Sequence, residues 1–150
     1  MDVESSYAPS LIVSVIYDDP PDLVELETYI RAGNWSGKVT AYTSTKSLRE
    51  QSIALSEWTY NPMGERRIEA GSDNGIGWFV LRFYSIDIAG HVVCQVMLAA
   101  SSVDAINPAH VPRLSVEVRT ELGLVERFAR QLARLAKNDR GQAALECLPG

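Results

Sequence analysis

The stretch WFVLRFYSIDIAGHVVCQVMLA, residues 78–99, carries the strongest β-hairpin signal in this chain. Two runs rich in β-branched and aromatic residues, 78–88 and 91–99, are joined through Ala89-Gly90, which is typical of two antiparallel strands and their turn. Successive side chains of a strand point to opposite faces, so the more apolar face of the hairpin is predicted to be buried. We expect that face to contain Phe79, Leu81 and Phe83 with Val92, Cys94, Val96 and Leu98.

Working outward from this hairpin, the sequence predicts further strands and two helices. Alternation predicts strands near 11–17, 24–31, 35–42, 67–70 and 114–119. Apolar stripes at helical spacing predict helices near 45–58 and 120–137, with N-caps from Ser44, Thr45 or Ser47 and from Thr120. Gly33-Asn34 favours a two-residue turn, and the helical stripe predicts that Phe128 is buried against the sheet.

These elements predict a single α+β domain over residues 1–137 and a loosely docked tail over residues 138–150. We expect a curved, mostly antiparallel sheet of about six or seven strands with the two helices packed on one face. A doubly wound parallel sheet is disfavoured because the strands follow one another without intervening helices. No internal repeat is visible in the sequence.

Negative charge gathers at the beginning of a chain whose formal net charge is −5. The first thirty residues hold seven carboxylates, and Arg31 is the first basic side chain. A segment of one sign attracts a basic partner and repels nucleic acid. The alternative is that these carboxylates only keep the domain soluble.

The strand near 24–31 points part of this charge outward. Val24, Leu26 and Ile30 are predicted to face inward, so the side chains between them face solvent. We therefore predict a partner-binding surface formed by Asp18, Asp19, Asp22, Glu25, Glu27 and Tyr29.

Sequence signatures of catalysis and of metal binding are missing. The two histidines, His91 and His110, belong to no zinc motif, and the glycines of residues 71–77 match no phosphate-binding loop. Cys94 and Cys147 form no CxxC pair and are expected to be free thiols. The prediction is a protein that is not an enzyme and that needs no metal or cofactor.

An alternative site lies on the less apolar face of the 78–99 hairpin. Arg82, Tyr84, Asp87 and His91 could serve a small ligand-binding or hydrolase-like domain. The sequence places no nucleophile beside them, and a structural hydrogen bond between Asp87 and His91 is the simpler interpretation. A deep pocket with convergent polar groups would favour this alternative, and a flat or acidic exposed face would favour protein binding.

The beginning of the chain does not look like an export signal. Residues 11–17 are too short an apolar run, with flanks too polar, for a signal peptide or a membrane span. We therefore expect a cytoplasmic protein that contacts neither membrane nor nucleic acid.

Two stretches resemble a known family. Gly33-Asn34-Trp35-Ser36-Gly37, a capped helix, residues 81–91 (LRFYSIDIAGH) and a closing amphipathic helix are similar to the WapI-type bacterial immunity proteins. The resemblance covers residues 11–137 as an order of elements, and only the two stretches match residue by residue. It implies an antiparallel sheet with two helices, no catalysis, and neutralisation of a cognate toxin by direct binding. A nuclease with a basic surface is one such toxin. The oligomeric state is not indicated.

Overall fold

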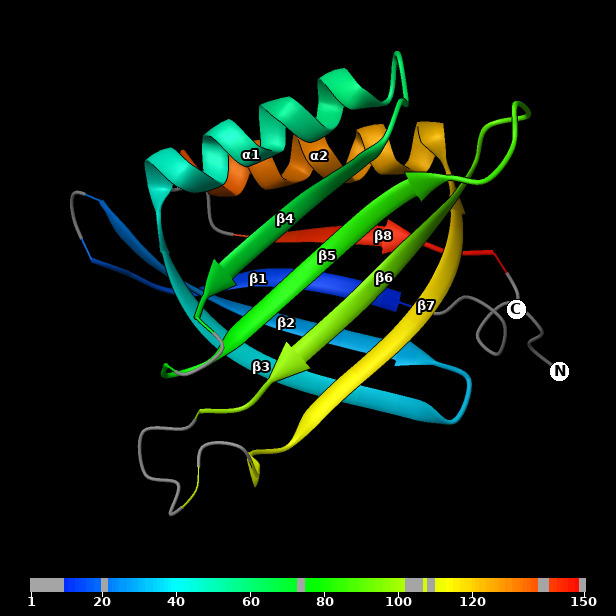
Figure 1. Ribbon diagram of the computed structural model, residues 1–150. Helices are drawn as coiled ribbons and strands as arrows, with labels where there is room; N and C mark the ends of the chain where they lie inside the picture. The colour runs from blue at the N-terminus through cyan, green and yellow to red at the C-terminus, as the bar shows by residue number, and fades with distance from the viewer. Residues whose placement is uncertain are drawn as a thin grey trace, which may run out of the picture.

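The computed structural model describes residues 10–19, 22–72, 75–101, 107, 110–137 and 141–148, and at 17–19 the backbone alone. These residues form eight strands and two helices (Figure 1). In chain order they are β1 (Ser10–Asp19), β2 (Leu23–Ala32), β3 (Trp35–Ser44), α1 (Thr45–Trp58), β4 (Glu65–Gly71), β5 (Trp78–Ser85), β6 (His91–Ala99), β7 (Arg113–Glu121), α2 (Leu122–Leu135) and β8 (Gln142–Glu146). The expected α+β class and the two helices are confirmed.

The strands form two antiparallel sheets of four strands each, where the sequence predicted a single sheet of six or seven. The first sheet has the order β3-β2-β1-β8 and the second the order β4-β5-β6-β7. The strands of the two sheets cross at an angle, and β3 packs against β4, β5 and β6 (Figure 1). Each sheet has one apolar face, and the two faces bury each other. Alternation within a strand is the same for one curved sheet and for two facing sheets, so it could not separate them.

The two helices lie side by side along one open side of the paired sheets (Figure 1). α1 packs against α2 and β4, and α2 packs against β8. The side chain of Phe128 on α2 is fully buried, and its ring centroid lies 6.3 Å from that of Phe83 on β5. The predicted burial of Phe128 is confirmed. No helix in the described ranges has the length and apolar character that crossing a bilayer requires.

The end of the chain differs from the loosely docked tail that we expected. Residues Gln142–Glu146 form β8, which pairs with β1. Ala143 and Leu145 point into the core, and Cys147 is also buried. A five-residue strand is too short to show helical or strand periodicity clearly, and its stability comes from burial against α2 and β1.

The topology contains a repeat that the sequence does not show. β1-β2-β3-α1-β4 and β5-β6-β7-α2-β8 have the same order of elements, and each helix follows its preceding strand without a linker. The last strand of each half pairs with the first strand of the other half, β4 with β5 and β8 with β1. The two halves are therefore bound together by exchanged strands.

Local chemistry explains several element boundaries. Gly33 has a φ of 62° in the turn between β2 and β3, as the Gly33-Asn34 signal predicted. The Ser44 hydroxyl accepts the N–H of Ser47 at 3.0 Å and caps α1. Thr120 does not cap α2, because Glu121 is the N-cap residue and the Thr120 hydroxyl donates to the Glu146 carbonyl at 2.8 Å.

Candidate functional site

The outer face of the first sheet contains the predicted partner-binding residues of β2. Val24, Leu26 and Ile30 are buried, and the alternation places Glu25, Glu27 and Tyr29 on the opposite, solvent-facing side. This strand orientation agrees with the prediction from the sequence. Because β2 lies between β1 and β3, these three side chains sit near the middle of the sheet rather than at an edge.

The carboxylates on this face have few internal partners. Glu27 lies 3.9 Å from the amine of Lys38, a distance at the limit for an ion pair, and both side chains are partly exposed. Glu25 stands opposite Tyr42 of β3 and forms no ion pair with any described residue. A solvent-exposed pair of this kind contributes at most about 1 kcal/mol. The negative charge of the two glutamates is thus largely available to an external partner.

The remaining predicted acids lie at the same end of the sheet. Asp22 is exposed, and its carbonyl accepts the N–H of Thr45 at 2.8 Å, where α1 begins. Asp18 and Asp19 end β1, where their backbones pair with Val24 and Leu23. Their side chains lie outside the described residues, so their part in the predicted surface stays a prediction.

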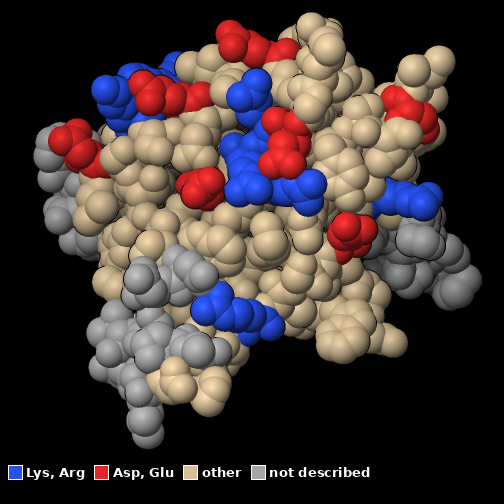
Figure 2. Space-filling view, viewed as in Figure 1, with Lys and Arg blue, Asp and Glu red and all other residues tan. Residues whose placement is uncertain are grey.

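Arg82 and Tyr84, from the alternative site, lie on the outer face of the second sheet within a polar network. The Arg82 Nε donates to Glu65 at 2.6 Å, and its Nη1 donates to Gln95 at 2.8 Å. The guanidinium carbon lies 5.0 Å from the centroid of the Tyr84 ring, and the Tyr84 hydroxyl donates to Glu117 at 3.3 Å. Figure 2 shows acidic and basic side chains side by side on this face of the molecule.

The pKa shifts in this network keep Glu65 and Arg82 charged and Tyr84 neutral. The hydrogen bond from Arg82, with a second from Arg67, lowers the pKa of Glu65. The same bond to Glu65 raises the pKa of Arg82. Desolvation and the neighbouring Glu117 raise the pKa of Tyr84, so its phenol stays protonated. None of these three pKa shifts is toward the neutral range where a general acid or base acts best.

Asp87 and His91, the other half of the alternative site, order the turn between β5 and β6. One Asp87 oxygen lies 2.7 Å from the His91 Nδ1. The other accepts the backbone N–H groups of Ala89 at 2.9 Å and His91 at 3.1 Å. The His91 side chain, followed by these backbone donors, lowers the pKa of Asp87. The expected hydrogen bond therefore exists, and it serves the geometry of the hairpin.

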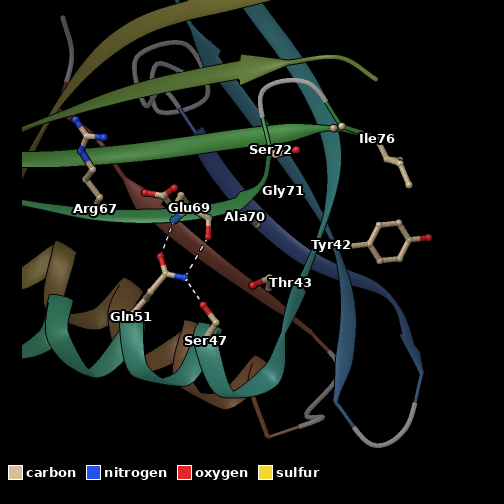
Figure 3. A pocket seen from close by; sticks show the side chains of 12 residues that line it. Tyr42, Thr43, Ser47, Gln51, Arg67, Glu69, Ala70, Gly71, Ser72 and Ile76 are labelled. Carbon is tan, nitrogen blue, oxygen red and sulfur yellow. Dashed lines mark hydrogen bonds between the residues drawn. The ribbon is translucent and has the colours of Figure 1, made fainter. Parts of the chain in front are cut away.

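A groove adjoins both predicted sites, because its residue Tyr42 stands opposite Glu25 and its residue Arg67 stands opposite Arg82. It is open, has a volume of about 920 Å³, and runs between the end of β3, the first turns of α1, and β4 with the loop that follows it (Figure 3). Its polar side chains include Tyr42, Thr43, Ser47, Gln51, Arg67 and Glu69. Gly77, which immediately precedes β5, also lines the groove, and a side chain there would collide with the Thr40 carbonyl.

Gln51 is the groove residue that sequence reasoning missed. Its Oε1 accepts the backbone N–H of Glu69 at 2.7 Å, and its Nε2 donates to the Glu69 carbonyl at 3.1 Å. The same Nε2 lies 3.0 Å from the Ser47 hydroxyl (Figure 3). No local pattern identifies such a residue, because its partner is a backbone group 18 positions away at the edge of a sheet.

The cysteines and the acidic groups form no metal centre in the described ranges. Cys94 and Cys147 are free and buried. Burial raises the pKa of Cys94 well above its ordinary value and that of Cys147 to about 12, so both are neutral thiols at physiological pH. Among the described residues, no three His, Cys, Asp or Glu side chains are grouped so that they could hold a metal ion.

Comparison of the chain with known protein families, with curated proteins and with solved structures finds no match.

Proposed function

We propose that this chain is a non-catalytic bacterial immunity protein that neutralises a cognate toxin by direct binding through the outer face of its first sheet. The observation that carries the proposal is the pair Glu25 and Glu27, which face solvent from the middle of that sheet and are almost unpaired among the described residues. The partner would be a protein with a basic surface, for which a nuclease is one candidate. The interaction would take place in the cytoplasm.

The composition of this face supports protein binding. Tyr29 and Tyr42 are half-buried next to the glutamates, and aromatic residues are enriched in protein interfaces. A central acidic area flanked by rings offers both electrostatic steering and apolar contact. The resemblance of residues 33–37 and 81–91 to WapI-type immunity proteins points to the same class of function.

The alternative, a small ligand-binding or hydrolase-like domain, receives less support. Arg82 and Tyr84 lie on an open sheet face, where Arg82 donates hydrogen bonds to Glu65 and Gln95 and Tyr84 donates one to Glu117. Asp87 bonds to His91 and to the backbone of Ala89 within the turn. Ligand sites are normally concave with polar groups that converge on a shared space, and none of these four residues lines the groove.

The proposal is tested by charge reversal with the protein encoded by the neighbouring gene as the candidate partner. The variant Glu25→Lys with Glu27→Lys should slow association, since the steering field of this face is reversed. The wild-type on-rate should fall as salt rises, because the Debye length is about 8–10 Å at physiological ionic strength. The on-rate is measured by stopped-flow fluorescence over a series of salt concentrations.

A matched control separates the local surface from net charge. Glu50 and Glu57 are exposed on α1, and the reversal Glu50→Lys with Glu57→Lys changes the net charge by the same amount. This control should retain most of the wild-type on-rate. An equal decrease of the on-rate in both double variants would contradict the proposed surface, and so would an on-rate that does not depend on salt.

A further inference from the structure

The carboxamide of Gln51 occupies the position that a neighbouring strand would take beside β4. Two residues that face each other in an antiparallel pair can exchange both of their N–H···O=C bonds. Gln51 makes the equivalent exchange with Glu69, accepting its N–H at 2.7 Å and donating to its carbonyl at 3.1 Å. The side-chain amide therefore imitates one peptide unit at the outer edge of the second sheet.

The outer edge of β4, beside which α1 packs, extends on either side of Glu69. Because the N–H and carbonyl of Glu69 point away from β5, the alternation of an antiparallel ladder places those of Arg67 at the same outer edge. The main chain of Arg67 and that of Glu69 together present the spacing that an added strand requires. An edge of this kind is a template for pairing with another chain unless it is covered.

The groove provides space along this edge. Arg67, Glu69 and Gly71 line one wall, and Ser47 and Gln51 of α1 line the floor. In Figure 3 the Gln51 side chain reaches from α1 to β4, and Tyr42 and Ile76 lie at the far end, away from this cluster. Ile76 is more than half exposed. A segment in the groove would thus meet main-chain groups first and apolar side chains beyond them.

We propose that β4 accepts an extended peptide segment of a partner protein as a fifth strand of the second sheet, with the Gln51 carboxamide as the group that it displaces. Strand addition takes its affinity from main-chain bonds and its selectivity from alternate side chains. Arg67 is paired with Glu65, whereas the exposed carboxylate of Glu69 forms no ion pair with any described residue, so a segment with a basic residue opposite Glu69 fits best. Tyr42 stands beside Glu25 and also lines the groove, but the β4 edge itself belongs to the second sheet, and the inference does not depend on the proposed function.

The other exchanged strand provides a comparison. The N–H of Ala144 on β8 donates to the Oε1 of Gln131 on α2 at 2.8 Å. This contact is a single bond, without the return bond that Gln51 makes. Gln131→Ala therefore serves as a matched control, because it removes a helix glutamine from the opposite sheet edge.

The test uses the full chain and a blocked heptapeptide, Lys-Thr-Val-Thr-Val-Thr-Lys, followed by NMR titration of the backbone and Gln side-chain amides. Binding at millimolar peptide should shift the amides of Arg67 and Glu69 and the Gln51 carboxamide. Gln51→Ala should bind about fivefold more tightly, because a competing hydrogen-bonded group worth about 1 kcal/mol is removed. Gln131→Ala should bind like the wild type, and a peptide with proline at both valine positions should not bind.

A second pair of variants tests the main-chain bond without removing Gln51. Arg67→Pro deletes the outward N–H, and proline is tolerated on edge strands at such positions. Arg67→Ala keeps that N–H and removes only the side chain. Arg67→Pro should abolish peptide binding, and Arg67→Ala should retain it within about twofold.

Three results would overturn the inference. The first is the absence of shifts at β4 at millimolar peptide. The second is weaker binding by Gln51→Ala, which would make Gln51 a ligand-binding residue instead of a displaced one. The third is a concentration-dependent dimer of the protein alone that Arg67→Pro abolishes, because the edge would then be covered by a second copy of the chain.

Discussion

Thr28 carries a buried hydroxyl that has no hydrogen-bond partner in the described structure. Its side chain is fully buried on the inner face of β2, between Val13 of β1 and Val39 of β3. A buried polar group without a partner costs about 1–3 kcal/mol. We therefore predict that Thr28→Val, which replaces the hydroxyl with a methyl group of similar size, raises the free energy of unfolding by about 1–3 kcal/mol.

Thr120 is a matched control for this substitution. It is also a fully buried threonine in a strand, but its hydroxyl donates to the Glu146 carbonyl at 2.8 Å. Thr120→Val deletes that bond and leaves the carbonyl without it, so the free energy of unfolding should fall by about 1–3 kcal/mol. The same chemical change should therefore have opposite effects at the two positions.

Urea unfolding followed by circular dichroism measures both effects. The unfolding midpoint should rise for Thr28→Val and fall for Thr120→Val, with unchanged slopes against urea. A midpoint that falls for Thr28→Val by as much as for Thr120→Val would refute the reasoning. It would mean that the Thr28 hydroxyl is hydrogen-bonded in solution.

Two further predictions concern the core and the β5–β6 turn. Phe128→Ala should lower the free energy of unfolding by about 3–5 kcal/mol, because the fully buried ring packs against Phe83; an unchanged urea midpoint would contradict this packing. Asp87 has a lowered pKa in the folded protein, so its contribution to stability is present above the ordinary carboxyl pKa of 3.8 and is lost as the pH falls through the lower folded value. Asp87→Asn should therefore reduce the melting temperature at pH 7, and the difference from wild type should shrink in acid; thermal scans at pH 7 and at pH 2 test this, and an equal difference at both would contradict it.

Local signals in the sequence were sufficient for most of the elements. Gly33 specified the β2–β3 turn through its positive φ, Ser44 capped α1, and the stripe containing Phe128 oriented α2. Each of these features depends on residues within a few positions of one another. The solvent-facing orientation of Glu25 and Glu27 was predicted in the same way, from alternation along a single strand.

The features that the sequence did not predict depend on contacts between distant segments. β8 pairs with β1 across nearly the whole chain, and this pairing turns the expected tail into a strand. Thr120 was a reasonable N-cap by its local sequence, but its hydroxyl donates to the carbonyl of Glu146 instead. Gln51 is an ordinary polar helix residue until the edge of β4 is placed beside it. Local patterns contain no information on which strand becomes an edge.

The exchanged-strand topology explains why binding is proposed on the surface of this fold. The apolar faces of the two sheets and the inner faces of α1 and α2 fill the interior with one continuous core. Binding surfaces are then available on the outer faces of the sheets and at their edges. Each exchanged strand is an edge, and each receives a glutamine side chain from the adjacent helix. Among the described residues, the first sheet presents nearly unpaired carboxylates, and the second presents a paired network of charges. A basic partner would thus bind most favourably at the first sheet. An extended chain would bind most favourably at β4, where one peptide-like group is already bound.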